Sequence, residues 1–350
     1  MMLRLVLEIT EPCTLTDGPT MGNSLRTLDF IPGSGLRGAF AGSYIGRHDV
    51  DAEFADFFDG ALYVSDAVPA DVLDGPSLPM PVTARACKVQ CVTPTSLDLA
   101  AEHGTDGTGR CLNCGGQLKK RTGWVGAFRS QPYLETVRTE LIGNTASESA
   151  GVARGTALDG SLRHSTRLSV GGRFVTDIAG PEELLSAFAE RIDLVEGRRW
   201  RVGSDQTTRG EAQIVSIRSV TEEQTTTAEG DWLALVAASR AVLIDDFLRP
   251  IDALDAGLRT QVMSCRFGTV AGWNAAQKLP KQDDVCVVAG SVWAGAVRDP
   301  VALRGALSER VGLRRTEGFG QLVALSAGQM TNIAAATSDR PVMVTDGENQ

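Results

Sequence analysis

Aromatic residues, histidine and long apolar stretches are all scarce in this sequence. Of its 350 residues, 5% are Phe, Trp or Tyr and three are histidine. No apolar run approaches the roughly 20 residues that a helix needs to cross a bilayer, and Met1–Arg4 leads into an alternating pattern rather than the apolar core of a signal peptide. We therefore expect a soluble, cytoplasmic protein with no membrane partner.

Positive charge is also in deficit, with 34 Lys and Arg against 43 Asp and Glu, a net charge of −9. This balance argues mildly against nucleic-acid binding, because neutralised phosphates supply most non-specific affinity. Basic residues nevertheless gather in residues 110–138 and 198–201, and acidic residues in residues 49–59. Such a local distribution can steer a polyanion whatever the total charge.

The cysteines do not form a disulfide framework, because their number is odd and four of the seven fall within 28 residues. These four are Cys87, Cys91, Cys111 and Cys114. Four thiolates select zinc and leave no open coordination position, so we predict a structural zinc site. Uncoordinated thiols and an iron–sulfur or redox role are the alternatives. His103 could replace one ligand, although a solvated loop histidine is the simpler interpretation.

The length and periodicity predict two α+β domains of the ferredoxin-like type. Alternation and four-residue spacing predict strands at 3–9, 232–236 and 285–290, and helices after Pro32 (capped by Ser34), at 181–194 and at 301–307. We expect an N-terminal domain at 1–225 with a cysteine-bearing insertion at about 75–135, a C-terminal domain at 226–335, and a flexible tail at 336–350. The polar stretch 221–231 fits an interdomain linker.

Residues 33–38 match the pattern G-x-G-x-x-G, which indicates either phosphate contact or close packing of a helix. A nicotinamide or flavin site is a weaker interpretation of this pattern than either of these. Pro32 interrupts the preceding strand, and no doubly wound series of strands and helices follows.

Each half of the chain ends with a loop rich in glycine and arginine that leads into a strand. In the second half, Arg314 and Arg315 offer bidentate phosphate donors, and Gly318 and Gly320 permit close approach of a backbone. Phe319 either stacks on a base or packs into the core. Two such loops would bind a sugar–phosphate backbone without reading much sequence.

Several motifs in order resemble the RAMP superfamily of CRISPR effector subunits, and most closely the type III-D subunit of the Cas-five-like capping group. They are Ile31-Pro32-Gly33-Ser34-x-Leu36-Arg37-Gly38-Ala39, Leu78-Pro79-Met80-Pro81, Gly272-Trp273, Ala289-Gly290-Ser291-Val292 and Arg315-x-Glu317-Gly318-Phe319-Gly320. The resemblance spans roughly residues 3–325. It implies two ferredoxin-like RAMP domains, with a zinc-knuckle insertion in the first.

The resemblance also implies a function and the residues that perform it. Such a subunit grips the 5′ repeat-derived tag of the crRNA and lies beside neighbouring RAMP backbone subunits and the large polymerase-like subunit. The implied RNA-binding residues are Ser34, Gly35, Arg37, Gly38, Arg209, Gly210, Arg314, Arg315, Gly318, Phe319 and Gly320. The first-domain loop departs from the pattern, since Glu211 and Ala212 stand where an aromatic and a glycine are usual.

No set of side chains forms a convincing catalytic centre, so we expect a non-catalytic protein. His48 follows the first predicted helix without a placed partner, and Asp17 and Asp29 fit turn and cap roles better than a metal site. His164, near Arg163 and Arg167, fits a basic patch. The enzyme alternative is a RAMP endoribonuclease acting on precursor crRNA or target RNA.

Overall fold

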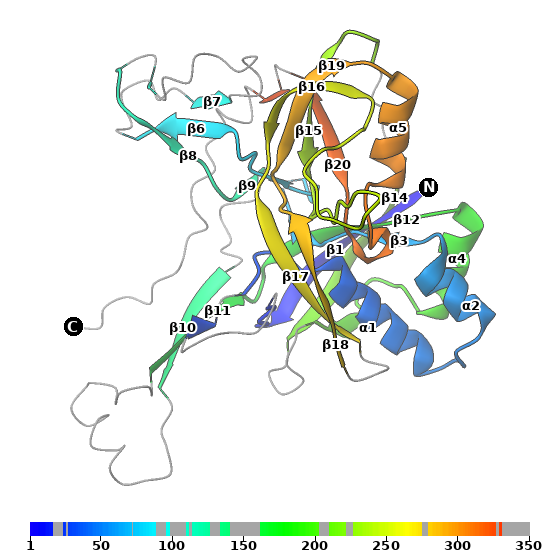
Figure 1. The fold of residues 1–350 in the computed structure, drawn as a ribbon. Helices are drawn as coiled ribbons and strands as arrows, with labels where there is room; N and C mark the ends of the chain where they lie inside the picture. Colours follow the sequence, from blue (N-terminus) through cyan, green and yellow to red (C-terminus); the bar gives the residue numbers. More distant parts are fainter. Residues whose placement is uncertain are drawn as a thin grey trace, which may run out of the picture.

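The computed structural model (Figure 1) describes thirteen stretches of the chain, and structural statements below concern these residues. They are 1–16, 24–25, 27–71, 73–88, 96–98, 110–111, 114–126, 134–140, 162–202, 210–221, 227–274, 279–326 and 329–330. Several predictions fall outside them, namely those for Asp17, Cys91, His103, Arg209 and the tail 336–350.

The first sheet has the strand order β13-β14-β1-β12-β3, with β4 also paired to β12. The strands are β1 (Met2–Glu11), β3 (Tyr63–Val64), β4 (Val68–Pro69), β12 (Arg173–Ala179), β13 (Arg199–Arg201) and β14 (Glu211–Val220). All these pairings are antiparallel. Counting β1, β3, β12 and β14 as first to fourth, the spatial order is 4-1-3-2, as in a split βαβ unit of the ferredoxin type.

Two helices, α1 (Gly33–Ile45) and α4 (Glu182–Arg191), pack on one face of this sheet. Their buried side chains share one core with β1 and β12, including Leu36, Phe40 and Tyr44 from α1 and Phe188 from α4. The short helix α2 (Ala52–Ala55) and the turn η1 (Asp56–Gly60) add Phe57 and Phe58 to the same core. The four-residue spacing in α1 therefore marks its buried face, as predicted.

The second sheet has the order β16-β19-β15-β20. Its strands are β15 (Trp232–Ala237), β16 (Leu258–Ser264), β19 (Val292–Val297) and β20 (Leu322–Ser326). Counted along the chain, they again give 4-1-3-2, and every pairing is antiparallel. Helix α5 (Pro300–Glu309) packs Leu303 against this sheet. Residues 238–257, all of which are described, contain no helix between the first and second strands.

A long hairpin of β17 (Phe267–Asn274) and β18 (Leu279–Val287) is inserted between β16 and β19 (Figure 1). The strand predicted at 285–290 is thus the end of a longer strand that begins at Leu279. Figure 1 shows this hairpin extending from the second sheet toward α1.

The remaining strands form small sheets. They are β2 (Ser24–Leu25), β5 (Leu78–Pro79), β6 (Ala84–Cys87), β7 (Ser96–Asp98), β8 (Leu118–Lys120), β9 (Trp124–Val125), β10 (Leu134–Glu140) and β11 (Leu162–Leu168). Residues 78–82 cover one face of the second sheet: Val82 packs beside Val236 and Val292, and its N–H donates to the Gly290 carbonyl at 2.8 Å. Among the described residues, no helix is long and apolar enough to cross a membrane.

Candidate nucleic-acid interface and metal centre

The glycine motif of α1 and the glycine-rich loop after α5 meet, although about 280 residues separate them in the chain. A Cβ added to Gly33 would lie 2.5 Å from the Val64 carbonyl oxygen and 2.8 Å from that of Glu317. Glu317 belongs to the short turn η2 (Arg315–Glu317), which contacts both α1 and β3. The structure therefore brings together predicted residues from both halves of the chain.

The first turn of α1 is capped by an aspartate from elsewhere in the chain rather than by Ser34. Pro32 is the N-cap and supplies no side-chain bond. The Gly33 N–H donates instead to Asp66 Oδ1 at 2.7 Å, and Asp66 is buried. A helix N-terminus attracts anions, but here a protein carboxylate is bonded to its first amide. The expectation of a Ser34 cap is therefore wrong.

The loop residues Gly318, Phe319 and Gly320 are enclosed by protein. The Phe319 ring is 2% exposed and lies between two guanidinium groups, at 4.7 Å from Arg314 and 5.1 Å from Arg240. Gly318 and Gly320 are buried with φ of +98° and +78°. A Cβ on Gly320 would collide with the Val311 carbonyl. Of the two roles predicted for Phe319, the structure shows packing into the core, and the glycines allow backbones to approach one another. The RNA contact predicted for these three residues stays a prediction.

Arg314 is held by carboxylates. Its Nη1 donates to Asp284 Oδ2 at 3.0 Å and its Nη2 to Glu317 Oε2 at 2.8 Å, while Lys281 Nζ reaches Glu317 Oε1 at 3.0 Å. Burial tends to raise the pKa of Glu317, but the hydrogen bonds and charges of Arg314 and Lys281 outweigh it and keep that pKa below its ordinary value. Arg314 therefore links the β17–β18 hairpin to η2, and each of its two terminal nitrogens donates to a carboxylate.

Other predicted residues at the same place remain accessible. Gly35 and Gly38 lie exposed on α1, and a Cβ at either would meet nothing within 4 Å. Arg315 is exposed, with Nη1 donating to the Glu309 carbonyl at 3.2 Å. Arg37 is partly buried and pairs with Asp59 at 2.9 Å, and Ser34 is also partly exposed. These five residues form the accessible part of the predicted interface.

Gly210 lies elsewhere. It is buried beside Cys13 and Val202, and an added Cβ would collide with both. The Val202 N–H donates to the Gly210 carbonyl at 2.9 Å, which joins β13 to the start of β14. This glycine packs within the first half of the chain.

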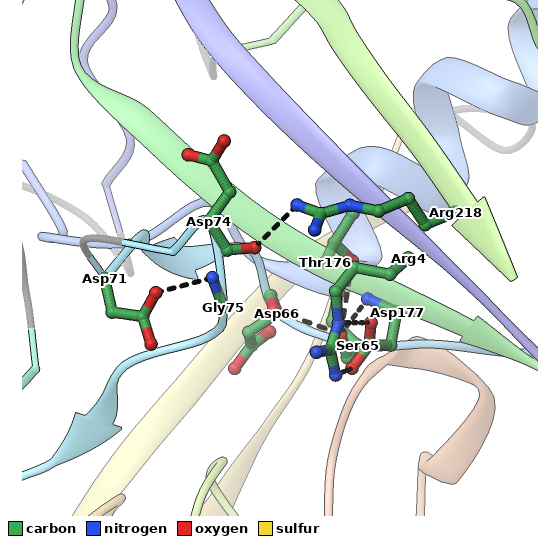
Figure 2. A network of polar contacts seen from close by, with 9 residues as sticks. All are labelled: Arg4, Ser65, Asp66, Asp71, Asp74, Gly75, Thr176, Asp177 and Arg218. Carbon is green, nitrogen blue, oxygen red and sulfur yellow. Dashed lines mark hydrogen bonds and ion pairs between the residues drawn. The ribbon is translucent and has the colours of Figure 1, made fainter. Parts of the chain in front are cut away.

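The face of the first sheet opposite the helices carries a polar network (Figure 2). Arg4 and Asp177 form a two-point ion pair at 2.8 and 2.9 Å. The loop after β4 folds over this face, since Ala70 packs on Val6 and Val175 and the Asp74 carbonyl accepts from Arg218 at 3.3 Å. RNA-recognition sheets stack bases on aromatic side chains, and this loop-covered face offers none from β1, β12 or β14.

Three of the four predicted zinc ligands converge. The Sγ atoms of Cys87, Cys111 and Cys114 all lie within 4.8 Å of one another, and those of Cys87 and Cys114 are 3.6 Å apart. A tetrahedral zinc with Zn–S bonds of about 2.3 Å would place its sulfurs roughly 3.8 Å apart. Gly115, with φ of +66°, donates its N–H to the Cys111 carbonyl at 2.8 Å and closes the knuckle turn. These thiols therefore fit a zinc ion.

Two of the candidate catalytic residues, His48 and Asp29, have aromatic partners. The His48 ring lies 4.8 Å from that of Tyr44 at the end of α1. Asp29 Oδ2 accepts a hydrogen bond from Trp124 Nε1 at 2.9 Å, and burial raises the Asp29 pKa. His164 lies in β11, opposite Arg138 in β10. His48 and Asp29 thus each contact a different aromatic side chain.

We call the contact between the start of α1 and the loop Arg315–Gly320 the junction. Sequence reasoning missed two of its central residues, Asp66 and Arg240. Asp66 caps α1, and Arg240 stacks on Phe30 at 5.2 Å as well as on Phe319. A signal was present, because each is the second residue of an S-x-A-V sequence, at 65–68 and 239–242.

No family model and no curated protein matches the sequence. Among solved structures, the chain is similar to a chain of the Type III-B Cmr-beta complex bound to cognate target RNA and AMPPnP, with 11% identity, coverage of 83% of this chain and 86% of that chain, and a TM-score of 0.48. It is also similar to Pyrococcus furiosus Cmr4 (Cas7), with 11% identity, 63% and 100% coverage and a TM-score of 0.29. A third is a RAMP protein binding different RNA substrates, with 8% identity, 93% and 100% coverage and a TM-score of 0.38.

Proposed function

We propose that this chain is a non-catalytic RNA-binding and assembly subunit of a type III-D CRISPR interference complex. It would hold the 5′ repeat-derived tag of the crRNA and contact neighbouring backbone subunits and the large polymerase-like subunit. The observation that carries the proposal is the junction, where the glycine motif of α1 meets the Arg315–Gly320 motif of a second sheet with the same strand order. The ordered motifs of the sequence support the same assignment.

In this proposal the RNA backbone lies along the exposed side of α1 near η2. Gly35 and Gly38 have no side chain there, so a sugar–phosphate backbone can approach the helix closely. Arg315 supplies an exposed positive charge beside them. The buried loop residues then act indirectly, because they hold α1 and η2 together.

The proposal is tested by placing a carboxylate on this surface. Gly38→Glu fits sterically, because a Cβ at Gly38 meets nothing within 4 Å. We expect it to weaken binding of 5′-tag RNA to the purified complex about tenfold through repulsion of phosphate. Affinity is measured over a series of salt concentrations, and the difference should shrink as salt rises.

Two matched variants are the controls. Gly38→Ala adds a methyl group without charge and should stay within about threefold of the wild type. Gly305→Glu places the same carboxylate on α5, where an added Cβ also meets nothing within 4 Å, and should leave affinity unchanged. Equal RNA affinity for Gly38→Glu and the wild type would remove this surface from the interface.

The endoribonuclease alternative is favoured by one observation: the partly buried Asp29 carboxyl accepts a hydrogen bond from Trp124 Nε1, and desolvation raises its pKa, a direction that suits an acid in catalysis. The same complexes are incubated with labelled precursor crRNA and target RNA. We expect cleavage, if present in the complex, to be equal in the wild type and Asp29→Asn. Loss of cleavage in that variant, with RNA binding retained, would establish the enzyme.

A further inference from the structure

A short motif occurs twice in the chain and ends each time in the same exposed loop. Residues 65–76 read SDAVPADVLDGP and residues 239–250 read SRAVLIDDFLRP, identical at five of twelve positions. We call Asp71–Gly75 the first tip loop and Asp245–Arg249 the second tip loop. The first tip loop follows β4, and the second follows β15, so the two loops do not come after corresponding strands of the two sheets.

The two copies have the same pattern of internal hydrogen bonds as well as similar sequences. Asp71 Oδ1 accepts from the N–H groups of Leu73 at 2.8 Å and Gly75 at 2.7 Å. Asp245 Oδ1 accepts from the N–H groups of Phe247 and Arg249, both at 2.9 Å. In each loop the aspartate N–H donates to the carbonyl four residues on, and the fourth residue has positive φ, 56° at Asp74 and 60° at Leu248.

The serine that starts each copy is also used in the same way. Ser65 Oγ accepts from the Asp177 N–H at 2.8 Å, and Ser239 Oγ accepts from the Gln321 N–H at 3.0 Å. Both serines are buried. Each tip loop is therefore fixed to its sheet by the strand and serine that precede it, as well as by its own internal bonds.

Both tip loops present large apolar side chains to solvent. Leu73 is 79% exposed, Phe247 77% and Leu248 76%, the highest values among the large hydrophobic residues described. An exposed apolar group on a rigid loop loses little conformational freedom on binding, which suits it to anchor an interface. In the second loop Arg249 covers one face of the Phe247 ring at 5.1 Å.

The charge around these tips disfavours RNA. The second loop carries Asp245 and Asp246, and the single arginine within it is tied to Asp245 at 2.6 Å. The first loop carries Asp71 and Asp74; Arg173 is shared between Asp74 and Glu8, and Arg218 donates to the Asp74 carbonyl at 3.3 Å. A phosphate chain would meet fixed carboxylates at both sites, whereas an apolar pocket with a basic rim on a protein would match the tips in shape and charge.

We propose that the two tip loops are equivalent docking points for two like protein surfaces, each an apolar pocket rimmed by Lys or Arg. Leu73 and Phe247 fill the pockets. The repeated loop geometry matches a repeated partner, which we take to be two copies of one subunit. This inference rests on the proposed function only in placing the chain within a multisubunit assembly.

The test uses the assembly purified from its native cells through a tag on this chain. A photo-crosslinking phenylalanine analogue replaces Leu73, Phe247 or, as a control, Val301, which is 68% exposed on α5. We expect positions 73 and 247 to crosslink to the same polypeptide, identified by mass spectrometry, at yields well above position 301. Crosslinks to RNA, crosslinks to unrelated polypeptides, or yields no higher than at Val301 would overturn the proposal.

Substitution supplies a second readout. Phe247→Ser and Leu73→Ser remove exposed side chains, so thermal unfolding of the chain should not change, while affinity for the crosslinked polypeptide should fall about tenfold for each. Val301→Ser should change neither quantity. The RNA content of the assembly is measured in parallel. An assembly without RNA would contradict the proposed function, whereas unchanged affinity in both loop variants would contradict only the docking points.

Discussion

At the scale of single residues, the glycines of the junction are required by space and backbone conformation. Gly320 has φ of +78°, and a Cβ there would collide with the carbonyl of Val311. The N–H of Val311 in turn donates to the Gly320 carbonyl at 2.9 Å. The backbone cannot move aside without breaking that bond. The glycine-rich loop is thus explained by protein packing, whether or not RNA lies nearby.

We therefore predict that Gly320→Ala lowers the free energy of unfolding by about 3 kcal/mol, from a strained positive φ and the displaced backbone. Gly305→Ala is the matched control. Gly305 lies within α5 and has open space at Cβ, so alanine should stabilise the chain by about 0.5–1 kcal/mol. Thermal denaturation of both variants checks this, and equal midpoints for wild type and Gly320→Ala would contradict it.

At the scale of elements, the predicted zinc knuckle should make the stability of the insertion at about 75–135 depend on bound metal. Zinc held by Cys87, Cys111 and Cys114 would fix β6 against β8, and Val82, just before β6, packs on the second sheet. The described part of this insertion holds few buried apolar residues, and a small region of that kind gains much of its stability from such a site. We expect about one zinc ion per chain, by elemental analysis of the purified protein.

Cys114→Ser separates metal binding from packing, because Cys114 is exposed whereas Cys87 and Cys111 are buried. The variant should lose zinc and unfold at a lower temperature, and a chelator should lower the midpoint of the wild type but not of the variant. Cys265→Ser, outside the cluster, should keep its zinc. A Cys114→Ser protein with full zinc content would rule out this ligand set.

The sequence predicted the elements better than their ends and partners. Alternation identified β1, and four-residue spacing identified α1, because each pattern reflects one buried face. Ser34 was expected to cap α1, but Asp66, more than 30 residues away, does so. Local spacing contains no information about such a distant partner. It likewise could not show that Phe319 and Arg314 are enclosed by groups from other elements.

At the scale of the whole molecule, four strands of the six-stranded first sheet and the four strands of the second share one order, yet in the described residues only the first sheet has both helices of the unit. Periodicity in the sequence indicated an α+β fold but not the order of strands, because β1 pairs with β12 and β14 some 170 to 210 residues later. The segment that replaces the missing helix holds Arg240 and the second tip loop. The space freed in the second half is thus used for the junction and for an exposed loop.

The junction also predicts how stability depends on pH. Glu317 is 13% exposed, accepts from Arg314 and Lys281, and has a lowered pKa in the folded chain. A carboxyl with a lowered folded pKa contributes stability that is present above its unfolded pKa and lost as pH falls through the folded value. Glu317→Gln should therefore lower the free energy of unfolding by about 2 kcal/mol at pH 7, because the positive charges of Arg314 and Lys281 lose the carboxylate that balances them.

As pH falls below the ordinary Glu value of 4.5, Glu317 is protonated in the unfolded chain before it is protonated in the folded one. The advantage of the wild type over Glu317→Gln should therefore shrink, and it should vanish once the pH is below the folded pKa. Denaturant unfolding of both proteins at pH 7 and at steps below 4.5 measures this difference. Glu229→Gln, at an exposed position before β15, should track the wild type at every pH. A gap between wild type and Glu317→Gln that stays constant down to pH 3 would mean that amide packing, not charge, sets the cost, and that the ion network does not hold the β17–β18 hairpin against η2.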